Sequence, residues 1–505
     1  MLKPQLIALP AIVALTAALA GPALAAGGTD TQTLRDDVTL AGVRAHQAAL
    51  QAIADANDGT RASGTPGYDA SAAYVADVLL DAGYQVRMQP FDYELFLIDS
   101  DPVLDPTNPD LPPYTVNEEF TVMEYSGAGD VTAAVTPVDL VLPPTTAPSS
   151  TSGCEAADFA GFPVGNIALI QRGTCTFRQK ADNAVTAGAS AVIIFNEGQE
   201  GRTDVIFGTL SPPQLSIPAL DTSFAVGNEL AGLAAAGPLT VRVATDVHVE
   251  TRTTTNVIAD STSGRTDRTV VVGAHLDSVN EGPGINDNGS GVAAILETAV
   301  QMADLQLQNA VRFTFWGAEE SGLIGSQFYV DSLTSRQRKN IALYLNFDMV
   351  GSPNFVRFVY DGDGSAFGIK GPTGSKQIEA TFTDYFASQG LASEPTAFDG
   401  RSDYDAFISA GIPAGGLFTG AEGIKTPAQE ATYGGMAGVA YDPCYHQACD
   451  DFDNVSLTGL DQMSDAIAHA TLTYAMTTSA ITGTAQGTTK VDTSTMSMHG
   501  HHAAR

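Results

Sequence analysis

Short apolar segments alternate with helical segments after about residue 249, and no other feature of this sequence restricts the fold as strongly. Residues 270–274 (VVVGA) form an apolar run typical of a buried parallel strand. Further strands are predicted at 84–91, 311–315 and 341–347. Helices are predicted at 40–54, 71–82, 291–302, 378–388, 403–410 and 460–476. The alternation predicts an α/β fold with a mixed, mostly parallel central sheet and helices on both faces.

A β-rich segment interrupts this pattern. A passage rich in Pro and Asp, residues 99–113, breaks the first part of the alternation. Short Val, Ile and Leu runs separated by Gly, Pro and Ser then follow, with one predicted helix at 178–187, so this unit is expected to be mostly β. Because the alternation resumes afterwards, we predict an insertion at 118–245 within a discontinuous domain at 35–115 and 246–480. A chain of 505 residues is long enough for two such cores.

The two ends of the chain carry segments outside these domains. Lys3 precedes an apolar run at 6–20 and an Ala-Leu-Ala triplet at 23–25, so residues 1–25 are predicted to be a signal peptide and the protein to be secreted and extracellular. That run and all later ones are too short to span a bilayer comfortably. Residues 481–505 are rich in Thr, Ser and Gly and are predicted to be a disordered tail. Three histidines in this tail are better explained as part of a polar segment than as a metal site: His499, His501 and His502.

The four cysteines fall into two local groups, Cys154 with Cys175 and Cys444 with Cys449. An even number of cysteines in an exported chain indicates two disulfides. Three pairings are possible, and we favour the local one. A zinc–thiolate site is the competing interpretation, but no Cys-x-x-Cys spacing supports it.

The chain is strongly acidic, with 57 acidic and 24 basic residues and a formal net charge of -33. Electrostatic repulsion therefore argues against nucleic acid or an anionic membrane as a partner. The charge favours cationic groups, of which the free α-amine of a peptide is one. Solubility alone explains most of it.

Histidines and carboxylates lie where predicted strands end. In α/β sheets, ligands bind beyond the carboxyl ends of the strands. Six residues of ligand-competent type lie in such strand-exit or inter-element loops: His275, Asp287, Glu319, Glu320, Asp348 and His446. Two histidines and three carboxylates can hold two zinc ions if one carboxylate bridges them. Such paired metals polarise a carbonyl and activate a water, so a metal hydrolase is favoured over a purely structural cluster.

Five motifs, in order, resemble those of secreted bacterial dizinc aminopeptidases of family M28, the streptomycete leucine aminopeptidase type. They are HLDS at 275–278, GINDNGSG at 284–291, WGAEESGLIGS at 316–326, NFDM at 346–349 and CYH at 444–446. The resemblance implies the zinc exopeptidase fold, two Zn²⁺ per chain and removal of N-terminal residues from peptides, with large apolar residues such as Leu preferred.

The resemblance also implies a role for each motif residue. Asp287 would bridge the zincs, with His275 and Asp348 completing one site and Glu320 and His446 the other. The remaining motif residues would take three further roles: Glu319 as general base, Tyr445 as hydrogen-bond donor to the oxyanion, and Asp277 as the group that orients His275.

Further residues are assigned by resemblance alone. The backbone at Arg401 would help to hold the substrate's α-amine, beside the carboxylates of Glu319 and Asp348, and Phe418 would line the pocket for the first side chain. A calcium site would use Asp37, the carbonyl of Val38, Asp461 and Asp465. A solvated acidic helix face explains Asp461 and Asp465 equally well. Residues 167–177, Lys180 and 187–196 resemble a protease-associated (PA) domain, which carries no catalytic groups.

Other functions remain open at this point. A carboxypeptidase needs basic residues to hold a terminal carboxylate, and Arg401 is the one obvious candidate. A glutaminyl cyclase typically works with one zinc, which the full ligand set argues against. A non-enzymatic binding protein is less consistent with the retention of Glu319 and all five ligands. We expect a monomer that acts on peptides with a free N-terminal amine.

Overall fold

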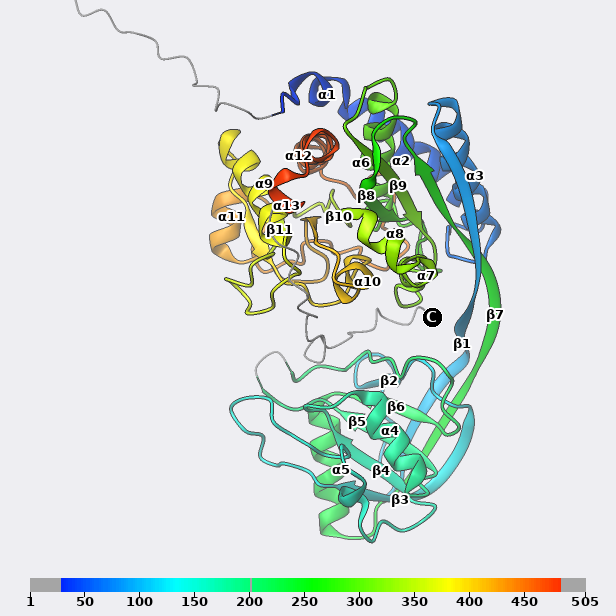
Figure 1. Ribbon diagram of the computed structural model, residues 1–505. Coiled ribbons are helices and arrows are strands. Elements are labelled where there is room, and N and C mark those ends of the chain that lie inside the picture. Colours follow the sequence, from blue (N-terminus) through cyan, green and yellow to red (C-terminus); the bar gives the residue numbers. More distant parts are fainter. Residues whose placement is uncertain (1–28, 200–201, 483–505) are drawn as a thin grey trace, which may run out of the picture.

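The computed structural model describes residues 29–199 and 202–482 (Figure 1). The predicted signal peptide, 1–25, and the tail histidines therefore lie outside the described residues. Two folded bodies lie one above the other and are joined along one side by the long strands β1 (Gln85–Asn108) and β7 (Thr240–Asp260), as Figure 1 shows. Within the described ranges, every helix is too short or too polar to cross a lipid bilayer.

The larger body is built on a mixed sheet. Its strand order is β12-β11-β13-β10-β8-β9-β7, and β1 pairs with β7. The β8, β9, β10 and β13 strands are mutually parallel, whereas β7 runs antiparallel to β9 and β11 antiparallel to β13. The strands have these bounds: β8 Arg265–His275, β9 Asn309–Trp316, β10 Ile341–Phe347, β11 Phe358–Tyr360, β12 Glu394–Thr396 and β13 Ala414–Phe418. The predicted mixed, mostly parallel sheet is confirmed.

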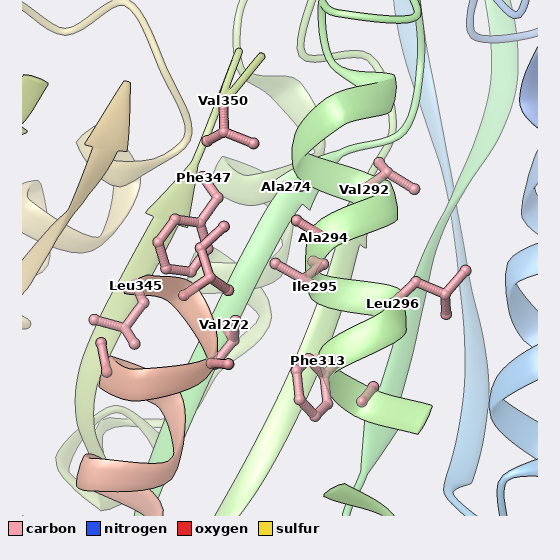
Figure 2. Close-up of a cluster of buried hydrophobic side chains, with 14 of the residues drawn as sticks. Val272, Ala274, Val292, Ala294, Ile295, Leu296, Phe313, Leu345, Phe347 and Val350 are labelled. Carbon is pink, nitrogen blue, oxygen red and sulfur yellow. The ribbon is translucent and has the colours of Figure 1, made fainter. Parts of the chain in front are cut away.

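Alternate residues of the central strands pack on opposite faces of the sheet, as the pleat requires. Val272 and Leu345 join a core formed with α6 and α12, which Figure 2 shows. Val271 and Tyr344 instead join a core formed with α7 and α10. Helices therefore cover both faces, as predicted. The helices of this body are α1 Gln32–Asp37, α2 Leu40–Asp55, α3 Pro66–Asp81, α6 Gly289–Met302, α7 Ile324–Ser332, α8 Ser335–Asn340, α9 Ser375–Ser388, α10 Tyr404–Ser409, α11 Pro427–Tyr433, α12 Leu457–Met476 and α13 Ser479–Thr482.

The smaller body contains the inserted segment and its own core. Four parallel strands form its sheet, with β2 added antiparallel at the edge. Its elements are β2 Phe120–Val122, β3 Gly129–Val138, β4 Ile167–Gln171, α4 Phe177–Thr186, β5 Ala191–Phe195, β6 Ala219–Thr222 and α5 Phe224–Ala236. The prediction of a single helix in this segment was wrong. The sequence of α5 is apolar at most positions, so it lacks the polar and apolar periodicity that marks an amphipathic helix.

The first strand is much longer than predicted. The sequence indicated a strand at 84–91 and a break at 99–113, but β1 continues to Asn108 through Pro90, Pro102 and Pro106. Proline lacks the N–H that a ladder needs, so it is tolerated in strands that pair on one side only. β1 pairs with β7 alone and therefore accepts these prolines.

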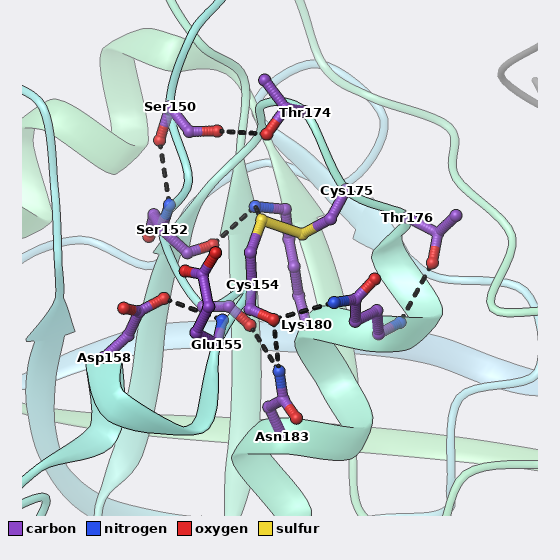
Figure 3. Close-up of a disulfide and its surroundings, with 12 residues drawn as sticks. Ser150, Ser152, Cys154, Glu155, Asp158, Thr174, Cys175, Thr176, Lys180 and Asn183 are labelled. Carbon is purple, nitrogen blue, oxygen red and sulfur yellow. Dashed lines mark hydrogen bonds between the residues drawn. A yellow bond between two sulfur atoms is a disulfide. The ribbon is translucent and has the colours of Figure 1, made fainter. Parts of the chain in front are cut away.

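Two disulfides link the cysteines, Cys154 with Cys175 and Cys444 with Cys449, which is the local pairing that we favoured. In the insertion, the buried Lys180 lies beside the first disulfide and donates to the main-chain oxygen of Ser152 (Figure 3). The second disulfide brackets His446 and so fixes the loop that carries it.

Candidate metal centre

Three adjacent strands deliver three of the predicted site segments to one edge of the sheet. β8 lies between β9 and β10. His275 is the last residue of β8, Asp348 follows β10, and Glu319 and Glu320 follow β9. Because these strands are parallel, their carboxyl ends meet at the same edge. Asp287 comes from the loop before α6.

The carboxylate of Asp287 lies between the two histidines. Its Oδ1 is 3.1 Å from Nε2 of His275, and its Oδ2 is 3.3 Å from Nε2 of His446. Each oxygen therefore faces a different imidazole, which is the arrangement that a bridging carboxylate requires.

One further carboxylate completes each side. Nε2 of His275 is 3.2 Å from Oδ1 of Asp348, and Nε2 of His446 is 3.1 Å from Oε2 of Glu320. The structure thus brings all five predicted ligands into one cluster, arranged as two overlapping sets that share Asp287.

The donor atoms of this cluster fit zinc. Nδ1 of His275 lies 3.2 Å from the main-chain oxygen of Asp277. A neutral imidazole that donates from Nδ1 to this oxygen has a lone pair on Nε2, which faces the carboxylates of Asp287 and Asp348. Ionised carboxylates also act only as hydrogen-bond acceptors. Burial alone would lower the pKa of both imidazoles, but the neighbouring carboxylates raise each pKa well above its usual value. The cluster therefore calls for positive charge between these atoms. Tetrahedral zinc with bonds near 2.0–2.1 Å separates its ligands by about 3.3 Å, close to the distances found here.

Glu319 lies beside this cluster and is 1% exposed. Its carboxylate lies close to His275 and Asp348, within 4.8 Å by the nearest ligand atoms. Burial raises the pKa of Glu319 well above its usual range; His275 opposes this shift, and Asp348 adds to it. A buried carboxyl with a raised pKa is suited to accepting a proton near neutral pH.

Asp277 contacts both His275 and the loop that carries the two glutamates. Its Oδ1 is 3.7 Å from Nδ1 of His275, which is too long for a hydrogen bond, and the main-chain oxygen makes the closer contact. The carboxylate also accepts from the main-chain N–H groups of Glu319 and Glu320, at 3.3 and 3.4 Å. It therefore holds the loop that presents both glutamates.

Sequence reasoning missed a chain of buried hydrogen bonds behind Asp348. Ser402 donates from Oγ to Oδ2 of Asp348 at 2.6 Å, and Asn346 donates to Ser402 at 2.8 Å. Tyr344 in turn donates to Asn346, and Trp316 donates to Tyr344, each at 2.9 Å. The one sequence signal for a role of Ser402 at the site was its position directly after Arg401, a predicted substrate-binding residue.

Two other residues support the loops of the site. Asp450 accepts from the main-chain N–H groups of Asn286 and Asp287, each at 2.9 Å. Arg61 is fully buried and donates to the carbonyl oxygens of Leu276, Pro283 and Gly284. The sequence placed Arg61 in a loop, without a signal that its guanidinium would pin the segment before Asp287.

A pocket opens directly onto Asp287 and Asp348. Phe418 lines it, with Met349, Tyr360 and Tyr445. Tyr445 is stacked on His446, with ring centroids 3.9 Å apart, and its hydroxyl lies 3.4 Å from a guanidinium nitrogen of Arg401. Arg401 is also paired with Glu422 at 2.6 Å. The predicted catalytic tyrosine and both predicted substrate residues therefore lie at this pocket.

Sequence comparison assigns the chain to a family. The sequence model of peptidase family M28 matches residues 256–471, and that of the PA domain matches residues 135–230. An aminopeptidase of Pseudomonas aeruginosa is 49% identical over 436 residues, which cover 86% of this chain and 80% of that protein. The chain belongs to peptidase family M28.

Other M28 relatives and solved structures agree with this assignment. Leucine aminopeptidase 2 of Arthroderma otae is 44% identical over 355 residues, which cover 70% of this chain and 69% of that one. The solved aminopeptidase from Aneurinibacillus sp. strain AM-1 superposes with a TM-score of 0.70 at 28% identity, over 87% of this chain and 95% of that one. A zinc aminopeptidase from Bacillus subtilis shares the fold, with a TM-score of 0.58 at 24% identity. The predicted M28 membership, the zinc exopeptidase fold and the inserted PA domain are confirmed, and the chain is an enzyme that hydrolyses peptide bonds.

The remaining candidate residues of this M28 peptidase lie away from the centre. His46 contacts Glu297, His248 contacts Asp99, and His469 contacts Thr31. The residues of the predicted calcium site lie on α1 and α12 or just beyond α1, and these two helices pack together: Asp37, Val38, Asp461 and Asp465.

Proposed function

We propose that this M28 peptidase is an aminopeptidase that binds two zinc ions per chain and releases the N-terminal residue of peptides. The observation that carries the proposal is the carboxylate of Asp287, whose two oxygens face two different histidines at 3.1 and 3.3 Å. His275, Asp287 and Asp348 would hold one zinc, and Asp287, Glu320 and His446 the other. Bound zinc would polarise the scissile carbonyl and lower the pKa of a water molecule.

The protein's own groups would then move the proton. Glu319, buried beside both ligand sets, would take a proton from the attacking water on its carboxylate and return it to the nitrogen of the leaving peptide. The hydroxyl of Tyr445 would donate to the oxygen of the scissile carbonyl as negative charge develops there.

The pocket favours a substrate with a free α-amine. The carboxylates of Glu319 and Asp348 would accept from the ammonium group, together with the main-chain carbonyl of Arg401, because the N–H of that residue already donates to Asp399 and Tyr404. Arg401 is the basic residue that lines this pocket, and Glu422 pairs with it. This pairing argues against a carboxypeptidase, which needs an uncompensated cation.

A direct test compares leucine p-nitroanilide with its N-acetylated counterpart. Acetylation removes the positive charge and leaves the buried carboxylates without a partner, so kcat/KM is expected to fall by at least about 100-fold. Hydrolysis of the free amine should stop after chelation and return with zinc. Equal cleavage of both substrates would contradict an aminopeptidase.

The side-chain preference follows from the walls of the same pocket. Phe418 and Met349 offer apolar surface, and named leucine aminopeptidases are among the relatives. We therefore propose that large apolar residues such as Leu are preferred at the N-terminus of the substrate.

We also propose that the enzyme is secreted and acts as a monomer. The apolar segment at 6–20 and two disulfides support export. The proposed domain limits stay at 35–115 and 246–480 for the peptidase and 118–245 for the insertion, within which the PA match at 135–230 falls.

We propose a calcium site where α1 meets α12. Asp461 and Asp465 lie one turn apart on α12, and oxygen ligands suit this ion. Added Ca²⁺ is expected to raise the unfolding temperature of calcium-free enzyme by about 3 °C, since a ligand bound only by the folded state stabilises it. Asp465→Asn should lose this response, whereas Asp77→Asn, on α3, should keep it. An unchanged unfolding temperature in calcium would refute the site.

A further inference from the structure

Three depressions among the described residues reach the ligand cluster. The one beside Asp287 and His446 has no room for a substrate group, and the other two share no lining residue. The first is the pocket already described, which contains Asp348 and Phe418. The second is lined by Asp277 and Glu320 on the peptidase side and by Phe96 and Glu124 on the side of the insertion. Since the first depression contains the amine-binding corner, the part of the substrate beyond the scissile bond must leave past the second.

The second depression adjoins a larger cavity between the two bodies. Ser321 and Glu124 line both. The cavity has a volume of about 150 Å³, and its apolar lining includes Tyr125 from the insertion and Leu323 and Ile324 from the peptidase domain. An apolar cavity of about 150 Å³ has room for a benzene ring.

The insertion side of this cavity is fixed in place. The ring of Tyr125 packs 5.7 Å from that of Phe96, which lines the second depression, and its hydroxyl donates to the main-chain oxygen of Glu94 at 2.8 Å. Arg178 of α4 donates to the carbonyl oxygen of Ser211, in a neighbouring loop of the insertion that is hydrogen-bonded to Glu124 and Tyr125. The wall is therefore preformed and adds little ordering cost when a substrate binds.

We propose that this interdomain cavity is a specificity pocket for the third residue of the substrate, and that it selects a large apolar side chain such as Phe. The proposal rests on the aminopeptidase activity proposed above. The depression beside Glu320 is small, about 40 Å³, and receives the second residue. Successive side chains of an extended peptide point to opposite sides, so the third side chain is carried to a different wall from the second. The inserted domain thereby contributes directly to substrate choice.

The test compares kcat/KM for three tetrapeptides. Leu-Ala-Phe-Ala is expected to exceed Leu-Ala-Ala-Ala by about tenfold, because part of a Phe side chain becomes buried. It is also expected to exceed its isomer Leu-Phe-Ala-Ala, which has the same composition. A ratio near one for the first pair would overturn the proposal.

A pair of matched variants locates the effect. Gln327 lies on the exposed face of α7 and lines the cavity, and its side chain donates to Asp331 at 2.8 Å. Gln327→Trp should fill the cavity and bring the Phe-to-Ala ratio close to one, with hydrolysis of leucine p-nitroanilide kept within about twofold of the parent. Asp331→Trp loses the same hydrogen bond without lining the cavity, and it should keep the preference. Retention of the preference for Phe in Gln327→Trp would refute the assignment of the cavity. A parent enzyme that hydrolysed none of these substrates would instead refute the aminopeptidase function.

Discussion

Replacing Glu319 with Gln is expected to lower kcat for leucine p-nitroanilide by about 10³-fold while the enzyme keeps its zinc. The substitution preserves the shape of the side chain and removes its capacity to accept a proton, and general-base catalysis contributes about 10²–10⁴-fold. Glu319 is not one of the five residues that form the two overlapping ligand sets, so the metal content should change little. The rate and the zinc content of the same preparation are the two measurements.

Glu297→Gln is a suitable control for this variant. Glu297 is also a buried glutamate of the peptidase domain, but it contacts His46, away from the site. This variant should keep the rate of the parent enzyme. A Glu319→Gln enzyme that hydrolyses the substrate at the parental rate would exclude Glu319 as the base, and loss of zinc from this variant would show that it acts as a ligand.

The sequence was sufficient to predict the strand exits that form the site. β8, β9 and β10 are apolar enough to be recognised, and a histidine or a carboxylate lies at the end of each strand or within three residues after it. Because parallel strands bring their carboxyl ends to one edge, the order of the elements predicted that His275, Glu320 and Asp348 would converge. The five motifs then supplied a role for each residue.

The groups that hold these residues were much harder to predict. Ser402 and Asp450 act through hydrogen bonds to residues far away in the sequence, and no periodicity marks these partners. Both the main-chain oxygen and the carboxylate of Asp277 lie near Nδ1 of His275, and the sequence alone could not show which of the two is closer. Such details depend on tertiary structure, which periodicity and spacing do not encode.

The long ribbon of β1 and β7 was missed for a related reason. Proline and aspartate ordinarily mark a break, and only the pairing of β1 on one side makes them acceptable. This error matters for function, because the middle of β1 places Phe96 at the second depression, where its ring packs against that of Tyr125 in the wall of the interdomain cavity. The ribbon is therefore part of the substrate-binding surface as well as a connection.

Asp287→Ala is expected to reduce bound zinc from two ions per chain to one or none, and to lower kcat by about 10³-fold or more. Each histidine would lose the Asp287 oxygen that faces it, and metal ions supply several kcal/mol of transition-state stabilisation in such enzymes. Zinc content after dialysis, together with the rate for leucine p-nitroanilide, measures both effects.

The control comes from a second acidic group of the same domain. Asp361, Asp363 and Glu379 also lie close together, but Asp363 is paired with Lys376 at 2.7 Å and needs no metal to balance it. Asp363→Ala should therefore keep both zinc ions and the parental rate. A parent enzyme that holds a single zinc would contradict the two-zinc proposal. Two zinc ions retained by Asp287→Ala would show that this carboxylate does not bridge them, and the paired-metal proposal would then lose the observation on which it depends.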